Sequence, residues 1–424
     1  MSLSATRGLR VESVPLTATP ELLNLLSVDS PLLWWRRGDG MVGIGVVETL
    51  SFSGKTRIKD AGAAWREVTG AATVSDSVSV AGSGLMAFGT FAFRSTSEIP
   101  SVLIIPRLVV GQRAGVTWLT RIGFADESAE PLTSESAEQI LTEHITASAQ
   151  LGAAPVVHLS PASLSEAGFT SAVNKAIERI DAGEVEKVVL ARELEGTLAG
   201  TQDLRVAITR LAESYPDCWT FSVDGLFGSS PETLITVHGR KVTARVLAGT
   251  ARRGSDTATD LSNAAELASS HKDLDEHGFA TRSVVNALTP YAEQLTVSDS
   301  PFTLKLPNLW HLATDIAGTL ASGSNSLDLV FALHPTAAVA GTPTVAAVEV
   351  IDDLEPFDRG RYAGPVGWIG ADGDGEWAIA LRCAQLTGST VTAYAGCGIV
   401  SDSVPANELV ETEMKFRPIV DALS

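Results

Sequence analysis

The chain has 424 residues, 45% of them hydrophobic, and a formal net charge of −19 at pH 7. Its length suits one large α/β domain or two ordinary ones, and its apolar share is enough for a large core. The acidic balance argues against a nucleic-acid-binding surface, which needs basic patches. It does not exclude an anionic small substrate, because a few local cations or a bound metal reverse the local field.

The N-terminal residues MSLSATRGLRVESVPL lack the apolar segment of a secretory signal, and no run reaches the roughly 18 apolar residues of a membrane span. The three cysteines, Cys218, Cys383 and Cys397, show neither metal-ligand spacing nor a paired framework. These patterns predict a reduced, cytoplasmic protein without a membrane segment.

In chain order, residues 40–125 are predicted to be rich in strands. The supporting stretches, GMVGIGVVETLSF, GLMAFGTFAF and GVTWLTRIGF, are apolar and bounded by glycine. Residues 136–152 are predicted to form a helix that ends at a glycine. The serine- and proline-rich segment 158–166 is the expected connector between the two halves of the chain.

The second half alternates helices and strands. Apolar residues at helical spacing over 169–180 predict a helix stopped by Gly183, and residues 187–196 (KVVLARELEG) form an apolar strand. Another helix is predicted over 203–214, followed by strands around CWTFSVDG and LFGSSPE. TLITVHGRKVTARVLAGT is predicted to be a hairpin with its turn at residues 238–239.

Farther on, a single long helix is predicted over 258–288, and a final helix from about Pro405. LPNLWHLATDIAGTL, GPVGWIG, EWAIALRCAQL and TVTAYAGCGIV are predicted to be strands. ADGDGE (371–376) resembles the start of a calcium loop but lacks the later ligands, so a turn between strands is favoured. This order predicts mixed sheets with helices packed outside them rather than a Rossmann alternation.

Two predicted helices each carry carboxylates three residues apart. HKDLDEH contains Asp273 and Glu276 on one face with His277 beside them, and ELVETEMKF contains Glu408 and Glu411. Taken alone, each pair also fits a solvated helix face. Together, the two pairs have the oxygen donors to hold a Mg²⁺ ion while leaving coordination sites for water and a carboxylate substrate.

Two further charged residues adjoin apolar strands. Lys187 begins KVVLAR, and Glu232 follows a proline in GSSPETL. Each fits an edge charge that protects a strand. If both point into a closed pocket, they become a base and an acid, because burial lowers the pKa of a lysine and raises that of a glutamate.

The candidate anion-binding side chains are Arg382, Tyr362 and Lys415. Arg382, predicted on an apolar strand, is interpreted as a buried functional cation. For Lys415 the alternative is a surface ion pair with Glu411, four residues earlier. The glycines of LAGT and YAGCGIV would let backbone N–H groups approach an anion closely.

Over residues 165–422 the chain resembles the chorismate-utilising enzymes, which include anthranilate, aminodeoxychorismate, salicylate and isochorismate synthases. The matching motifs, in order, are KVVLAR, GSSPETL, LAGTARRG, HKDLDEH, LWHLATDIAGTL, HPTAAVAGTP, RGRYAGPVGW, ALRCA, AGCGIV and ELVETEMK. The resemblance implies an α+β chorismate-binding fold like that of anthranilate synthase component I, with two large mixed or antiparallel β-sheets flanked by helices. It also implies a single domain over 1–424, in which a variable β-rich portion, 1–157, completes the fold of the catalytic portion.

The resemblance further implies a role for each matched residue. Glu276 and Glu411 would be direct Mg²⁺ ligands, and Asp273 and Glu408 would bind through water or support the ligands; the family often has glutamate in place of Asp273. The metal would grip the ring carboxylate of chorismate. The residues implied to hold or line the substrate are Gly249, Thr250, His311, Ala338, Tyr362, Arg382, Gly396, Gly398 and Lys415.

Three positions discriminate between the branches of this family. Anthranilate synthases carry glutamine where this chain has Lys187, and aminodeoxychorismate synthases place a nucleophilic lysine where it has Ala248. Ala338 stands where the salicylate, anthranilate and aminodeoxychorismate enzymes tend to carry threonine. This pattern indicates an isochorismate synthase, with salicylate synthase as the alternative.

The expected reaction is a Mg²⁺-dependent, reversible isomerisation of chorismate to isochorismate. Lys187 would activate a water that attacks ring C2, and Glu232 would protonate the departing C4 hydroxyl. The product would feed menaquinone or siderophore biosynthesis. A non-catalytic binding module for carboxylated metabolites is a second class of function. A monomer is expected, without an amidotransferase subunit, nucleic acid or membrane as partner.

Overall fold

The computed structural model describes residues 7–148, 151–200, 202–254, 256–305 and 309–424. By its internal contacts the chain divides into two compact units. Unit 1 comprises Met1–Glu232, His334–Ala371 and Ala378–Ser424, and unit 2 comprises Thr233–Leu333 and Asp372–Trp377. In the described part of the chain, no helix combines the length and apolar composition needed to cross a membrane.

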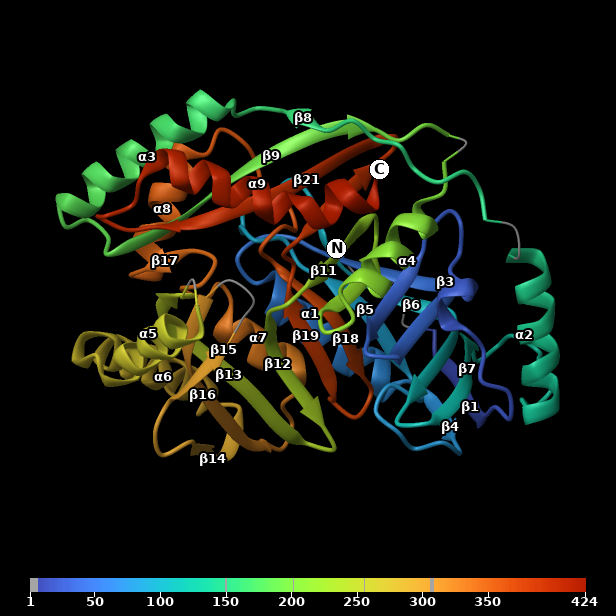
Figure 1. Ribbon diagram of the computed structural model, residues 1–424. Coiled ribbons are helices and arrows are strands. Elements are labelled where there is room, and N and C mark those ends of the chain that lie inside the picture. The colour runs from blue at the N-terminus through green and yellow to red at the C-terminus, as the bar shows by residue number, and fades with distance from the viewer. Residues whose placement is uncertain (1–6, 149–150, 201, 255, 306–308) are drawn as a thin grey trace. The chain divides into compact units, whose positions relative to one another are not determined.

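Unit 1 is built mainly from antiparallel strands (Figure 1). They are β1 (Leu9–Pro15), β2 (Leu32–Arg36), β3 (Asp39–Phe52), β4 (Thr73–Asp76), β5 (Met86–Thr90), β6 (Ser101–Arg113), β7 (Val116–Phe124), β8 (Ser160–Pro161), β9 (Lys187–Thr197), β10 (Trp219–Val223), β11 (Leu226–Ser230), β17 (Gly341–Thr342), β18 (Pro365–Gly370), β20 (Cys383–Thr387) and β21 (Thr390–Ile399). A further strand, β19 (Gly375–Ile379), runs from unit 2 into unit 1.

The pairing of these strands is continuous from β9 to β6. β9 pairs with β21, then β20, β11, β10, β2, β3 and β6 follow in that order, each antiparallel to the one before. β5 and β7 pair with opposite halves of β6, and β1 joins β7 antiparallel and β4 parallel. The prediction of mixed, mainly antiparallel sheets is therefore confirmed.

The helices of unit 1 are α1 (Arg57–Gly70), α2 (Ser134–Ser148), α3 (Glu166–Asp181), α4 (Leu204–Ser214), α8 (Thr344–Leu354) and α9 (Pro405–Ala422), with a 3₁₀ turn at Leu22–Leu25. The predictions of α2, α3, α4 and α9 are confirmed, except that Leu151 and Gly152, the predicted end of α2, are not helical and residues 149–150 lie outside the described residues. α1 was not anticipated within the strand-rich region. Its buried residues recur at helical spacing, as Ile58, Ala61, Trp65 and Val68 show.

Helices α3 and α9 contact each other, and α9 packs on β21 while α3 packs on β9 (Figure 1). Arg192 of β9 reaches into this layer. Its guanidinium lies 5.3 Å from the ring centroid of Phe416 and 6.0 Å from that of Phe169, and its Nε donates to Thr412 Oγ1 at 2.9 Å. The strand and both helices are thus joined at one buried point.

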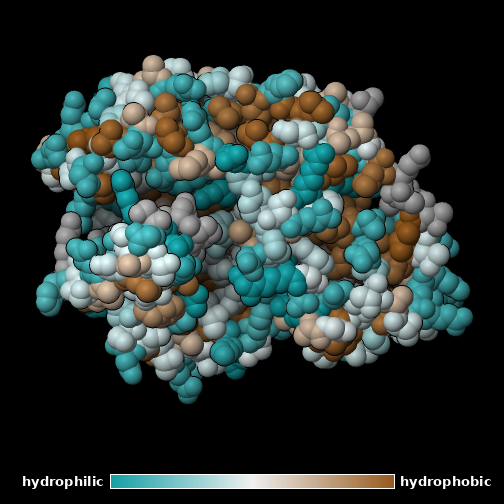
Figure 2. Space-filling model, viewed as in Figure 1, coloured by the Kyte–Doolittle hydropathy of each residue, from teal (hydrophilic) through white to brown (hydrophobic). Residues whose placement is uncertain are grey.

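The outward face of α9 mixes charged and apolar side chains. Val410 and Met414 are 52% and 54% exposed, and Figure 2 shows brown, apolar surface over the upper part of unit 1, where α3 and α9 lie in Figure 1. Glu408, Glu411 and Lys415 are instead half-buried. They share the helix face that also presents buried Thr412, so the carboxylates do not form a fully solvated stripe.

Unit 2 contains β12 (Thr233–His238), β13 (Lys241–Arg252), β14 (Ala292–Val297), β15 (Phe302–Lys305) and β16 (Leu309–Leu320), with helices α5 (Thr257–Ser269), α6 (His271–Leu288) and α7 (Ser326–Leu333). β16 is the central strand: β13 pairs along one edge, β14 and β15 pair with successive parts of the other, and β12 extends the sheet beyond β13. Helices α5 and α6 contact both β13 and β16.

The single helix predicted over 258–288 is wrong. Ser270 has φ −69° and ψ 110°, outside the helical region, and it separates α5 from α6. Its hydroxyl accepts a hydrogen bond from the N–H of Asp273 and so caps α6. A serine side chain offers the backbone this local alternative to a helical bond, and the apolar period alone does not reveal it.

The turn predicted at residues 238–239 lies one residue later. His238 pairs with Lys241, and Gly239 and Arg240 take φ values of 54° and 64°, as a two-residue type I′ turn requires. The turn predicted at ADGDGE is confirmed between β18 and β19. Buried Asp374 from that segment accepts the N–H of Gly239 at 2.6 Å and of Arg240 at 3.2 Å.

Candidate active site

The side chain of Lys187 lies over the backbone of Gly398. Lys187 is the first residue of β9 and is half-buried. A Cβ built on Gly398 of the neighbouring strand β21 would stand 2.8 Å from Lys187 Cε and 3.5 Å from Nζ. The absence of a side chain at Gly398 therefore leaves the space that the lysine occupies.

Gly396, two residues earlier on β21, lies beside two further candidate residues. Its carbonyl accepts a hydrogen bond from Lys415 Nζ at 2.8 Å, and a Cβ built on it would stand 3.0 Å from Tyr362 Oη. Tyr362 is buried and stacks on Tyr394 with ring centroids 5.3 Å apart. The sequence-predicted residues Lys187, Gly398, Gly396, Tyr362 and Lys415 are therefore brought together in unit 1.

The two glycines yield a prediction. A Gly398→Ala variant is expected to keep a near-native thermal midpoint but to lower kcat by about 10²-fold, because its methyl group displaces only the flexible end of Lys187. Gly396→Ala is the matched control for stability. Its methyl group would meet Leu190 O at 2.7 Å, and because backbone cannot yield, the thermal midpoint should fall. Steady-state kinetics and calorimetry check both results, and an unchanged kcat in Gly398→Ala would contradict the placement of Lys187.

Glu232 lies between β11 and β12, as predicted, and is the last residue of the first segment of unit 1. Its side chain keeps some accessible surface, yet the surrounding protein desolvates the carboxyl and raises its pKa. The charges of Arg382, Lys187 and Lys415 are near enough to counter this effect in part. Burial outweighs the three cations, and a carboxylic acid whose pKa is raised in this way can hold a proton for transfer.

The prediction that Arg382 lies on a strand is wrong. Arg382 lies between β19 and β20, half-buried, in the left-handed region with φ 48°. Its carbonyl accepts the N–H of Ser229 on β11 at 3.1 Å, which holds this conformation. The apolar neighbours in ALRCA favoured a continuous strand, which the positive φ of Arg382 interrupts. Non-glycine residues held at positive φ often occur at functional sites.

On α9, the proposed metal ligand Glu411 already has a cationic partner. Lys415 Nζ forms an ion pair with Glu411 Oε1 at 2.6 Å, so the i,i+4 pair weighed as an alternative is present. Lys415 also binds Gly396 O, so the pair belongs to the site rather than to open surface. Glu413 lies off this face, exposed, with Arg192 at 3.9 Å.

In unit 2 a bulge brings three candidate positions together. The register of β13 against β16 shifts between Ala248 and Thr250, and Gly249 in the bulge has φ +77°. The carbonyl of Gly249 lies 3.3 Å from His311 Nδ1, and a Cβ built on Gly249 would stand 3.3 Å from Asp273 Cβ. The side chains of Thr250 and of Glu276 lie outside the described residues.

His277 fixes α6 against this bulge. Its Nδ1 lies 3.0 Å from Ala248 O and its Nε2 lies 2.6 Å from Thr314 Oγ1. A carbonyl only accepts, so Nδ1 carries the proton, and in the neutral ring Nε2 accepts from the threonine hydroxyl. The histidine that the sequence placed beside the acid pair therefore orients that pair's helix.

The proposed metal ligands lie in two places. Asp273 and Glu276 are on α6 in unit 2, and Glu408 and Glu411 are on α9 in unit 1. Among the described residues, no three His, Cys, Asp or Glu side chains form a group that would hold a metal ion. The donors themselves are all carboxylate oxygens, which match the preference of Mg²⁺.

Sequence reasoning missed the link between β9 and α9. Arg192, the last residue of KVVLAR, is buried and bonded to Thr412, which stands on the same helix face as Glu408, Glu411 and Lys415. An arginine inside an otherwise apolar strand was the available signal. Ala338 is exposed, in a turn in which Thr336 O accepts from the N–H of Ala340 at 3.0 Å.

Three comparisons place this geometry among known proteins. The profile of a family described as chorismate binding enzyme matches residues 16–424. The isochorismate synthase DhbC of Bacillus subtilis is 38% identical over 278 residues, which cover 63% of this chain and 70% of that protein. The solved structure of MenF, the menaquinone-specific isochorismate synthase of Escherichia coli, has a TM-score of 0.75 at 26% identity, covering 99% of this chain and 95% of that one.

A more distant solved structure bears on the fold alone. Anthranilate synthase component I from Streptococcus pneumoniae has a TM-score of 0.69 at 20% identity, covering 96% of this chain and 92% of that one. With the antiparallel pairing described above, this likeness confirms the predicted α+β fold of the anthranilate synthase component I type.

Proposed function

The chain belongs to the family of chorismate binding enzymes, and on this premise we propose that it is an isochorismate synthase that converts chorismate to isochorismate. The observation that carries the proposal is the position of Lys187 over Gly398 in unit 1, beside Gly396, Tyr362 and Lys415, with Glu232 in the same unit. Burial raises the pKa of the Glu232 carboxyl, as suits a proton donor, and the proposed base is the neutral amine of Lys187. A base and an acid are what a reaction that adds one water and releases another requires.

In the proposed reaction, Lys187 takes a proton from a water that attacks ring C2, and the ring double bonds shift. Glu232 gives its proton to the departing C4 hydroxyl, which leaves as water. One water enters and one leaves, so the change is a reversible isomerisation. Arg382, Lys415 and the Tyr362 hydroxyl would hold the carboxylates of the substrate, because cationic and O–H donors match such anions.

The test is incubation of the purified protein with chorismate and Mg²⁺, followed by chromatography. Isochorismate without pyruvate supports the proposal. Salicylate with pyruvate would assign the chain to salicylate synthase, which adds an elimination to the same first step. No conversion would leave the chain a binding module for carboxylated metabolites and would contradict the proposal.

Mg²⁺ is the proposed cofactor, with Glu276 and Glu411 as direct ligands and Asp273 and Glu408 in support. A bound Mg²⁺ would polarise the ring carboxylate of the substrate.

Chelation of the metal is expected to abolish turnover, and added Mg²⁺ is expected to restore it. Titration calorimetry gives a second readout: Glu411→Gln should weaken Mg²⁺ binding by about 10-fold or more, whereas Glu413→Gln, on the exposed side of α9, should not. Equal affinities in the two variants would remove Glu411 from the ligand set.

The proposal also covers the surroundings of the enzyme. Water as the nucleophile makes an ammonia-supplying amidotransferase subunit unnecessary, and we propose a cytoplasmic monomer whose product feeds menaquinone or siderophore biosynthesis. Light scattering of the purified protein at assay concentration measures the oligomeric state directly.

A further inference from the structure

The edge of β9 that faces away from β21 is completed by two kinds of partner. Near Lys187 the partners are backbone: the N–H of Glu186 donates to Thr342 O at 2.7 Å and that of Val189 to Ala340 O at 2.9 Å. Beyond them, side chains take over. Arg359 Nη2 donates to Val189 O at 2.7 Å, and the N–H of Ala191 donates to Glu355 Oε1 at 2.7 Å.

Glu355 and Arg359 form a buried ion pair, called here the Glu355/Arg359 pair. Their side chains are 1% and 0% exposed, and two hydrogen bonds of 2.6 and 2.8 Å join them. Two charges removed from water are retained only when each is paired and its remaining hydrogen-bonding groups are satisfied. The backbone of β9 provides two of these hydrogen-bonding partners, the carbonyl of Val189 and the N–H of Ala191, so the pair and the strand stabilise each other.

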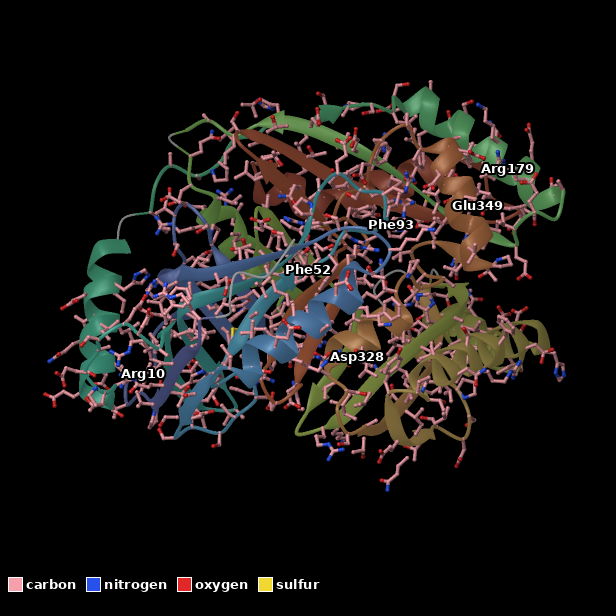
Figure 3. The ribbon with its side chains drawn as sticks, turned by 180° about the vertical axis from the view of Figure 1, so that it is seen from behind. Arg10, Phe52, Phe93, Arg179, Asp328 and Glu349 are labelled. Carbon is pink, nitrogen blue, oxygen red and sulfur yellow. The ribbon has the colours of Figure 1, made fainter. Side chains whose placement is uncertain are left out.

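The pair also contacts the other segments that carry candidate site residues. Arg359 Nη1 donates to Val339 O at 2.9 Å, next to Ala338, and the N–H of Tyr362 donates to Arg359 O at 2.9 Å. The guanidinium lies 4.6 Å from the ring centroid of Phe93 and 5.9 Å from that of Tyr362. Figure 3 shows Phe93 in this region, near the helix α8 on which Glu349 is labelled.

We propose that the Glu355/Arg359 pair is a positioning pair for the isomerisation: it fixes the strand that carries Lys187 relative to Ala338 and Tyr362. The inference rests on the proposed function. The guanidinium is completely buried, so it acts through the backbone rather than by touching substrate. A planar guanidinium has five donors in a fixed fork and reaches a carboxylate and two carbonyls at once, which the single ammonium of a lysine does not.

A second buried ion pair in unit 1 provides a matched control. Asp203 and Arg205 have side chains 4% and 3% exposed and are joined at 2.6 Å. Asp203 caps α4 and accepts the N–H of Gly152 at 2.9 Å, and Arg205 donates to Leu26 O at 3.4 Å. The hydrogen bonds described for this pair go to Gly152, to Leu26 and to the start of α4 rather than to β9 or the turn around Ala338. It therefore reports what the loss of a buried pair does to stability alone.

The test compares Arg359→Met, Arg359→Lys and Arg205→Met with the wild-type protein. Both methionine variants should lower the thermal midpoint, and Arg359→Lys should recover most of that loss because the charge on Glu355 is again balanced. Only the two Arg359 variants should lower kcat, by about 10- to 100-fold with a smaller change in KM. Rescue of stability without rescue of kcat separates positioning from mere neutralisation of a buried charge.

Hydrogen exchange over residues 187–191, measured by mass spectrometry, reports how firmly this part of β9 is held and does not depend on turnover. It should be faster in Arg359→Lys than in Arg205→Met. A wild-type kcat in Arg359→Lys, or unchanged exchange in that variant, would overturn the positioning role. Absence of turnover in the wild-type protein would instead count against the proposed function, and the exchange comparison would still decide the role of the pair.

Discussion

Replacing Lys187 by alanine is expected to lower kcat for chorismate conversion by about 10²–10⁴-fold, the range that a positioned general base contributes. The lysine stands over Gly398, and Lys415 is bonded to Glu411 and to Gly396 O and so does not replace it. Steady-state kinetics with isochorismate as the measured product gives the result.

The control for this variant is Lys175→Ala, which removes an exposed lysine from α3 in the same unit. It should leave both kcat and the thermal midpoint unchanged. Because Lys187 is only half-buried, its removal should also cost little stability, so a folded but inactive Lys187→Ala protein is the expected outcome. Undiminished turnover would remove Lys187 from the mechanism.

Replacing Glu232 by glutamine is expected to lower kcat by a similar factor, about 10²–10⁴-fold, because an amide has no proton to give to the departing hydroxyl. The pH dependence follows from the raised pKa of Glu232. The protonated acid is fully present below its ordinary value of 4.5 and is lost as the pH rises through the higher folded value. Wild-type kcat should therefore fall on the alkaline side of that folded pKa, and this limb should be absent from Glu232→Gln.

The free energy of unfolding should also decrease as the pH rises. Burial disfavours the charged carboxylate, so the contribution of Glu232 to folding is present at low pH and is lost as the pH rises through the folded pKa. Thermal midpoints of Glu232→Gln measured from about pH 5 to about pH 8 should consequently vary less than those of the wild-type protein. Glu178→Gln, at an exposed position of α3, is the control, and parallel curves for Glu232→Gln and wild type would contradict the raised pKa.

Much of the fold followed from the spacing of apolar residues and from local signals. The helical period from Phe169 to Ile180 predicted α3, and the unbroken apolar run after Lys187 predicted β9. The helix α1 escaped notice because its stripe relies on alanines, with Trp65 as its largest member. The break at Ser270 was missed because a hydroxyl that caps a helix leaves no trace in an apolar period.

The candidate site was less accessible to sequence reasoning alone. The resemblance supplied Lys187 and Glu232, and their catalytic roles stay predictions. The contacts of the Glu355/Arg359 pair with β9 join residues 164 and 170 positions apart in the chain, which no local pattern encodes. The left-handed backbone of Arg382 likewise depends on a bond from Ser229 on another strand.

The glycines at positions 396 and 398 also constrain how the enzyme can evolve. Glycine has the smallest side chain, so every replacement on this part of β21 adds volume where Lys187 and Tyr362 already stand. Substitution there can narrow the room for a substrate but never enlarge it. A descendant enzyme that accepts a bulkier ring must therefore gain its space at other positions of unit 1, for example at exposed Ala338. Point mutations at these two glycines can therefore only exclude larger substrates.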